Sequence, residues 1–312
     1  MLTKLLGKVM LVGLLTSLVS CSQQPEQSNP SLEPSTISED TKVIVLGDIS
    51  KNPAKKIRRF QPLANYLAEN LSQFDINTGE VKIASDFPTM INWLKEGEVH
   101  LYFDSLYPAM RINQESGAQP ILRRWKRGDA EYHTIIFTMK DRGIKSLADL
   151  KGKKVAFDDR QSTSGYMLPM AYLIEAGLKP NEKGSASDVV AANEVGYIFS
   201  DDDENTIQWV ISSKADAGAV DNQTFKQVPE DVRDAMTILA ETEKVPRQVV
   251  MVPANMDPEL LAQLKSILTT MDEDPKGKEV LTKFQKTAKF DEFPTLQGLD
   301  RMQQLYNIVE NR

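Results

Sequence analysis

Apolar positions along the chain follow two alternating patterns, one typical of strands and the other of helices. Gly47 and Asp48 are expected to turn the chain after the first strand, and Ser146 is expected to cap a short helix. Strands are predicted at 42–46, 81–84, 99–103, 132–139, 154–157, 189–192, 217–220, 237–239 and 248–252. Helices are predicted at 57–71, 89–95, 165–176 and 204–212, and again over most of the chain after 252.

Two series of strands and helices, one after the other, predict an α/β fold with two lobes, each a mixed sheet flanked by helices. The C-terminal helices are expected to return to the first lobe. We therefore expect lobe 1 to combine 42–134 with 244–312, and lobe 2 to comprise 135–243.

The N-terminus has the features of an export signal. Lys4 and Lys8 precede an apolar run at 9–19, which is shorter than the roughly 20 residues that a membrane-spanning helix needs. The run ends in Leu-Val-Ser-Cys, which resembles the bacterial lipoprotein box and implies cleavage before Cys21 and lipid modification of that residue. The alternative is an ordinary secretory signal with an incidental cysteine. The polar, proline-containing stretch at 22–40 is predicted to be an extended tether.

Composition narrows the functional classes. The 312 residues carry a net charge of -7, which argues against a nucleic-acid partner. One cysteine excludes an internal disulfide and cysteine-cluster metal sites, and two histidines argue against a histidine-rich metal centre. The sequence has no G-x-x-x-x-G-K-[ST], H-E-x-x-H or G-x-S-x-G motif. We therefore expect a binding protein without enzymatic activity, cofactor or metal.

The most informative segment is a polar turn between a predicted strand and a predicted helix. Ser162, Thr163, Ser164 and Gly165 lie at the start of that helix, where amides lack internal partners and the helix dipole is positive. Hydroxyl groups beside such amides can bind an anion, and Gly165 would let a ligand approach the backbone. The alternative is that one hydroxyl caps the helix and the others face water.

Several segments together resemble the phosphate, phosphonate and phosphite substrate-binding proteins of bacterial ABC importers. The resemblance covers roughly residues 42–290. It is carried by FQPLANYL at 60–67, YFDSLYPAM at 102–110, GIKSLADLKGKKVAF at 143–157, STSGYMLP at 162–169, EAGLKP at 175–180 and ADAGAVD at 215–221.

This resemblance implies a two-lobed, type II periplasmic-binding fold that closes on a ligand in the cleft between its lobes. By the same resemblance, the hydroxyls and amides at 162–165 bind the oxyanion. A tyrosine in the first-lobe turn matches Tyr107, and a polar residue after the second-lobe strand matches Asp221. Asp104 and Ser105 replace the small pair usual in the family, and the family's late histidine has no counterpart within 195–204. The predicted ligand-binding residues are Asp48, Asp104, Ser105, Tyr107, His133, Ser162, Thr163, Ser164, Gly165 and Asp221.

Carboxylates are unexpected beside an anionic ligand, so the acidic residues of this set need a chemical explanation. A fully ionised dianion beside Asp104 or Asp221 would be repelled, whereas a P–OH proton or an ammonium group could donate to a carboxylate. The alternative is that both acids are solvated charges at the rim. For His133, contact with the ligand and a hydrogen bond at the hinge both stay open.

The leading hypothesis is a monomeric, lipid-anchored receptor on the periplasmic or extracytoplasmic face of a bacterial membrane. It would deliver a small phosphorus oxyanion (phosphonate, phosphite or phosphate) to an ABC permease. The same fold could instead bind a sulfonate or ferric iron, the latter suggested by His100, Tyr102 and Asp104, or act as a ligand sensor for a membrane partner. The cationic run at 123–127 is predicted to be a surface loop.

Overall fold

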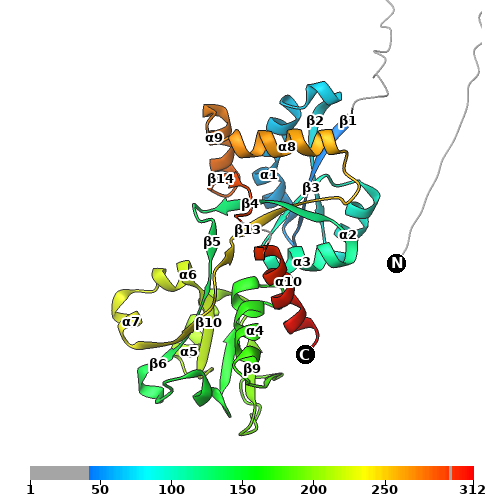
Figure 1. Cartoon of the computed structure of the whole chain (residues 1–312). Coiled ribbons are helices and arrows are strands. Elements are labelled where there is room, and N and C mark those ends of the chain that lie inside the picture. Colours follow the sequence, from blue (N-terminus) through cyan, green and yellow to red (C-terminus); the bar gives the residue numbers. More distant parts are fainter. Residues whose placement is uncertain (1–41, 295–296) are drawn as a thin grey trace, which may run out of the picture. The chain divides into compact units, whose positions relative to one another are not determined.

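The computed structural model describes residues 42–294 and 297–312 (Figure 1). The predicted export signal, Cys21 and the tether at 22–40 lie outside the described residues. In the two described stretches, no helix combines the length and apolar character that crossing a bilayer requires.

The first lobe is built on a six-stranded sheet in the order β14-β4-β13-β3-β1-β2. Strand β1 pairs in parallel with β2 and β3, whereas β13, β4 and β14 are joined through antiparallel pairs. Successive residues of β1 enter cores on opposite faces, because helices cover both sides of the sheet. The strands are β1 (Lys42–Ile49), β2 (Ile76–Ala84), β3 (Leu101–Asp104), β4 (Gln119–Lys126), β13 (Gln248–Val252) and β14 (Thr287–Asp291). The helices are α1 (Pro53–Glu69), η1 (Ser72–Phe74), α2 (Phe87–Glu96), α3 (Leu106–Ser116), α8 (Pro258–Thr270) and α9 (Pro275–Lys283).

The second lobe is built on another six-stranded sheet, in the order β11-β6-β10-β7-β9-β8. Strands β10, β7, β9 and β8 pair in parallel, and β6 is antiparallel to β10 and β11. The strands are β6 (Thr134–Met139), β7 (Lys154–Phe157), β8 (Pro180–Glu182), β9 (Val195–Phe199), β10 (Ala217–Asp221) and β11 (Met236–Glu241). The helices are η2 (Lys140–Arg142), η3 (Leu147–Leu150), η4 (Thr163–Met167), α4 (Leu168–Glu175), α5 (Asp203–Ile211), α6 (Asn222–Gln227) and α7 (Glu230–Asp234).

Two features join the lobes. A two-stranded ladder pairs β5 (Glu131–Tyr132) with β12 (Val245–Pro246) at the chain crossings (Figure 1). The C-terminal helix α10 (Gln297–Glu310) packs on α3 of the first lobe and on α4 of the second. Its buried Leu305 and Tyr306 share one apolar core with Leu106 of α3 and Met167 of η4. Helix α10 therefore belongs to the packing of both lobes.

Three local predictions are wrong. Gly47 and Asp48 do not turn the chain, because β1 continues in register with β2 as far as Ile49. Residues 189–192 are not a strand: Val189 is 87% exposed, and the sheet is completed by β9 instead. The cationic run at 123–127 is not a surface loop, since it contains the end of β4 and Arg124 is fully buried.

The boundaries of α2 and η3 have local causes, and the capping role predicted for Ser146 is confirmed. Gly97 ends α2 in a left-handed conformation with φ of 73°, which glycine adopts without steric cost. Ser146 and Asp149 form a capping box at η3, where each side chain satisfies a backbone amide that the short helix leaves unpaired.

Candidate functional site

The predicted anion-binding segment lies at the start of η4, which continues directly into α4 in the second lobe. Ser162 caps η4: its Oγ accepts from the Gly165 amide at 3.0 Å, and its carbonyl accepts from the Met167 amide at 3.0 Å. Ser162 therefore satisfies two of the amides at this helix start. Thr163 and Ser164 are 1% and 7% exposed, so their hydroxyls lie inside the protein.

Gly165 is required by packing against its own loop. A Cβ at this position would lie 2.3 Å from the Cβ of Asp158, a separation that real side chains do not tolerate. The glycine thus lets η4 close on the residue that follows β7. The expectation that it serves close approach of a ligand stays a prediction.

The segment lies where the two lobes meet. The Tyr107 amide of α3, in the first lobe, donates to Thr163 Oγ1 at 2.9 Å. The Tyr107 ring packs against Tyr166 and Tyr306, and its hydroxyl donates to Glu310 of α10. The structure thus brings Tyr107 to the serine-threonine segment through its backbone, and a ligand contact by its hydroxyl would require the bond to Glu310 to break.

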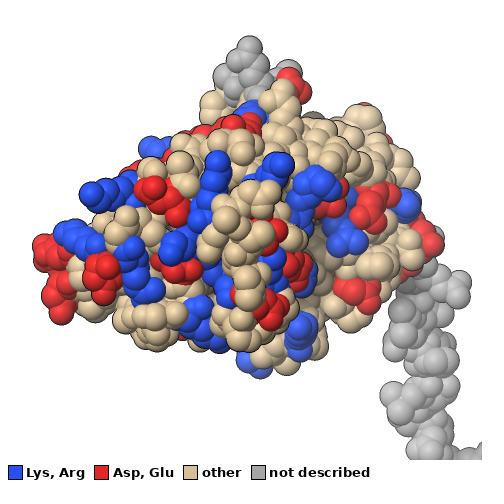
Figure 2. Space-filling model, turned by 90° about the horizontal axis from the view of Figure 1, so that it is seen from below, with Lys and Arg blue, Asp and Glu red and all other residues tan. Residues whose placement is uncertain are grey.

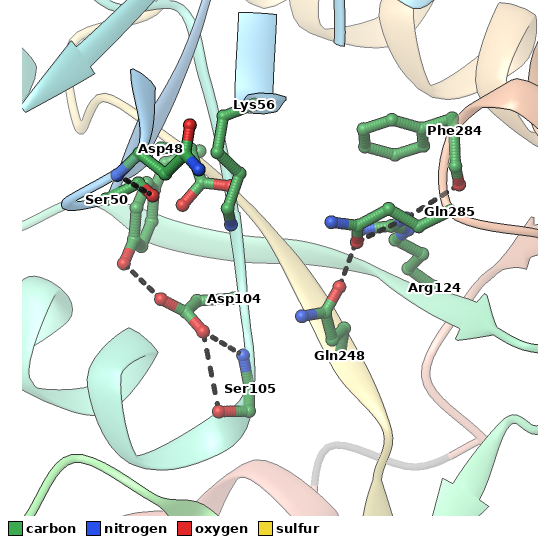
Figure 3. Close-up of polar contacts among 11 residues, drawn as sticks. Asp48, Ser50, Lys56, Asp104, Ser105, Arg124, Gln248, Phe284 and Gln285 are labelled. Atoms are coloured by element: carbon green, nitrogen blue, oxygen red, sulfur yellow. Dashed lines mark hydrogen bonds and ion pairs between the residues drawn. The ribbon is translucent and has the colours of Figure 1, made fainter. Parts of the chain in front are cut away.

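The first-lobe wall carries Asp48 and Asp104 at the ends of neighbouring parallel strands (Figure 3). Asp48 forms an ion pair with Lys56 of α1, and burial is the main cause that raises its pKa to about 6. Asp104 accepts from the Tyr102 hydroxyl at 2.5 Å and from the Ser105 amide at 2.7 Å, with Ser105 Oγ at 3.4 Å. Asp104 and Ser105 thus form one hydrogen-bonded unit at the start of α3.

The second-lobe wall carries three carboxylates. Asp221 is 4% exposed and caps α6 by accepting from the amides of Gln223 and Thr224. Burial raises the pKa of Asp158 to about 6 and that of Asp203 to about 7, and the charge of Asp221 adds to both shifts. This wall therefore resists taking up further negative charge.

Arg124 is a functional candidate that the sequence did not indicate. Its guanidinium is fully buried and stacks on Phe284, with 3.7 Å from Cζ to the ring centroid (Figure 3). It donates to Thr287 Oγ1 at 2.9 Å, to Gln248 Oε1 at 2.6 Å and to the Phe284 carbonyl at 2.8 Å. Burial lowers the pKa of Arg124 to about 9, so it is still charged at pH 7. No described carboxylate forms an ion pair with it.

Arg247, in the connection between β12 and β13, is a second candidate. Its guanidinium stacks on Tyr132, with 4.3 Å from Cζ to the ring centroid. Its buried Nε has no hydrogen-bond partner among the described residues. Burial raises the pKa of both Asp203 and Tyr132, and the positive charge of Arg247 opposes each rise. Hydrogen bonds from Thr163 and Ser164 also oppose the rise for Tyr132. Arg247 therefore lies beside the serine-threonine segment and the second-lobe acids. A buried donor without a partner is costly, and an anion would satisfy it.

Lys126 completes the cationic side. Burial lowers its pKa to about 7, followed by the charges of Arg124 and Arg247. The negative charge of Asp104 acts in the opposite direction. Lys126 is thus close to Asp104, which was predicted as a site residue, and to Arg124 and Arg247, which were not.

His133 lies at the chain crossing. Its Nε2 is 3.1 Å from a Glu241 oxygen, and its amide donates to Asn222 Oδ1 at 3.2 Å. Both contacts are of the kind expected if His133 forms a hydrogen bond at the hinge. Contact between His133 and the ligand stays a prediction.

The iron alternative finds no support in the geometry. His100 Nδ1 accepts from the Val45 amide at 3.1 Å, and the Tyr102 hydroxyl is bonded to Asp104. Within the described ranges, no group of three His, Cys, Asp or Glu residues has a metal-binding arrangement.

Two α/β lobes joined by a two-stranded ladder, with acidic residues at the ends of their strands, define a class of proteins that bind small molecules between lobes. Several solved structures share this architecture. PhnD1 from Prochlorococcus marinus, solved with methylphosphonate, has a TM-score of 0.60 at 18% identity, covering 88% of this chain and all of that one. The predicted type II periplasmic-binding fold is therefore confirmed.

Sequence comparisons identify the family. The family described as "ABC transporter, phosphonate, periplasmic substrate-binding protein" matches residues 49–294. The chain belongs to this family, and the resemblance stated from its motifs is confirmed.

Two relatives are similar in sequence as well. The phosphate-import protein PhnD of Mycolicibacterium smegmatis is 27% identical over 212 residues, or 66% of this chain, which spans 61% of that protein's length. XAC2383 from Xanthomonas citri, solved bound to chloride ion, has a TM-score of 0.78 at 31% identity over 86% of this chain and 98% of that one. The same protein has also been solved bound to ATP.

The raised pKa of Asp203 predicts a pH-dependent stability. The folded chain keeps a proton on Asp203 up to about pH 7, whereas the unfolded chain loses it near pH 4. The contribution of Asp203 is therefore fully present below pH 4 and is lost as pH rises through 7. We expect Asp203→Asn to be more stable than the wild type at pH 8, by about 1–2 kcal/mol, and equally stable near pH 4. Urea unfolding at several pH values measures this.

The exposed Asp231→Asn serves as the control for this substitution. An Asp203→Asn variant whose stability differs from the wild type by the same amount at pH 4 and pH 8 would show that this carboxyl does not hold a raised pKa.

Proposed function

We propose that the chain captures a small phosphorus oxyanion outside the cytoplasm and delivers it to the permease of an ABC importer. Phosphonate, phosphite and phosphate all have the required head group. Family membership supports this, as do the relatives solved or described with methylphosphonate, phosphate and ATP. The observation that carries the proposal is the hydroxyl segment at 162–164, joined to the first lobe by the Tyr107 amide and flanked by Arg247.

Capture works by stabilising the closed arrangement of the lobes. A ligand between them bonds to the second-lobe hydroxyls and to first-lobe groups at once, and an open arrangement offers only one of these sets. The β5–β12 ladder is the proposed hinge, with the lobe division expected from the sequence. No chemical step on the ligand is needed, so we propose a binding protein and not an enzyme.

The acids act in selection. A fully ionised dianion would be repelled by Asp221 and its neighbours, whereas a ligand with a P–OH proton or an ammonium group donates to a carboxylate. The cations Lys126 and Arg247 hold the ionised oxygens. We propose that this pairing of opposite walls selects the protonation state of the cargo.

Attachment to the membrane belongs to the same proposal. Cleavage before Cys21 and acylation of its thiol would hold the binding domain on the periplasmic or extracytoplasmic face of a membrane through the 22–40 tether, as a monomer. The permease and the lipid surface are then its two partners.

The hydroxyl segment is tested by calorimetric titration of the full chain in detergent with phosphate, phosphite and methylphosphonate. Replacing Ser162, Thr163 and Ser164 together by Ala removes three hydroxyl groups, and we expect affinity for the preferred anion to fall by about 100-fold or more. Ser187→Ala, in an exposed loop, is the matched control and should bind normally. Unchanged affinity in the triple variant would remove this segment from the binding site.

The acids are tested with Asp104→Asn and Asp221→Asn. Asn also caps helices, so α6 should be retained in the second variant. We expect at least one substitution to weaken binding about tenfold and to alter its dependence on pH between 5 and 8, because the ligand proton loses its acceptor. Identical affinities and pH profiles in both variants and the wild type would mean that neither acid contacts the ligand.

The anchor is tested by mass spectrometry of the N-terminal peptide of protein purified from bacterial membranes. We expect a chain that begins at Cys21 and carries acyl groups, and a Cys21→Ala variant recovered outside the membrane fraction. An unmodified thiol in the mature chain would support the ordinary secretory signal instead.

A further inference from the structure

A cavity of about 720 Å³ lies beside the lobe junction. Its walls come from α1, the end of β4, and the α9–β14 turn in the first lobe, and from α6 in the second. The basic residues that line it are Arg59, Lys126, Arg127, Lys283 and Lys286, and Gln227 closes it from α6. We call it the cationic pocket.

The positive charge of this pocket is not compensated by the protein. None of the described residues that line it is acidic. Lys283 pairs with Glu279 at 2.6 Å, whereas the other four cations form no ion pair with a described carboxylate. This is unusual in a chain with net charge -7, whose basic and acidic side chains are interspersed on the face in Figure 2. Uncompensated like charges repel one another, and a bound anion would relieve that repulsion.

The backbone around the pocket is also strained. Arg127, Gln285 and Lys286 have φ of 60°, 57° and 55°, and all three line the cavity. They are half of the six non-glycine residues with positive φ in the described chain. Such a conformation costs about 1 kcal/mol or more and is retained where the surroundings or a ligand require it.

The cationic pocket adjoins the buried Arg124. Lys126 lines the pocket and also responds to the charges of Arg124, Arg247 and Asp104. Gln285 accepts from Arg124 Nη2 at 3.2 Å, so the pocket wall contacts the buried arginine directly. The pocket therefore shares a wall with the cationic side of the proposed site.

We propose that the cationic pocket binds a second anionic group of the same ligand, so that the preferred cargo is a molecule with two or more linked phosphate-type groups. This inference rests on the proposed function and specifies its substrate class. The head group lies at the hydroxyl segment, and the remaining negative charge lies among Arg59, Arg127 and Lys286. Because α6 contributes Gln227, this second contact also joins the lobes.

The test is a calorimetric titration of the full chain with orthophosphate, pyrophosphate and tripolyphosphate. We expect affinity to rise along the series, with tripolyphosphate bound about tenfold or more tightly than orthophosphate. In a variant with Arg59→Gln, Arg127→Gln and Lys286→Gln, this preference should shrink to about threefold or less, while orthophosphate affinity stays within about twofold of wild type.

The matched control replaces Lys95, Lys151 and Lys278 by Gln. These three lysines are exposed, lie outside the pocket lining and remove the same total charge. A preference lost equally in the control would reduce the effect to non-specific attraction and overturn the inference. Orthophosphate binding without any preference for the longer anions would also overturn it, and would leave the proposed function standing. A chain that binds none of the three anions, nor methylphosphonate, would overturn both.

Discussion

The guanidinium of Arg124 carries a full positive charge inside the first lobe, and its hydrogen-bond partners are neutral oxygens. A buried charge without a counter-ion is costly, so its field is available to attract an anion from outside. Lys126 and Arg247 extend the same positive region to the lobe junction, where Asp158, Asp203 and Asp221 face them. Binding therefore requires a ligand that satisfies cations on one side and carboxylates on the other.

The fold produces this arrangement through the ends of its strands. Asp48 and Asp104 end neighbouring parallel strands of the first sheet, and Asp221 ends a parallel strand of the second. Carboxyl ends of parallel strands collect on one edge of a sheet, which is where ligands bind in open α/β folds. The hinge ladder then supplies Tyr132 and Arg247 between the two edges. Helix α10 packs on both lobes through its apolar face. Its Glu310 also accepts a hydrogen bond from the Tyr107 hydroxyl, which holds that side chain at the lobe junction.

Residue spacing and turn residues predicted those parts of the site whose conformation is set by neighbours in the sequence. The serine-threonine segment, the helix that follows it and the strands at 154–157 and 248–252 are readable from spacing and turn residues. The burial of Arg123 and Arg124 could not be predicted from the sequence, because a run of cationic residues is normally exposed. Arg124 is buried by partners more than 120 positions away in sequence, such as Gln248 and Thr287. The strand expected at 189–192 fails for a related reason: its residues favour a strand, but no neighbouring strand pairs with them.

The measurement that tests the central claim most directly is a crystal structure of the chain with methylphosphonate. The account predicts phosphonate oxygens about 3 Å from the hydroxyls of Thr163 and Ser164, with Arg247 donating from the hinge side. A ligand bound elsewhere, with the hydroxyl segment at 162–164 still bonded to the Tyr107 amide and without contact to the ligand, would contradict the account.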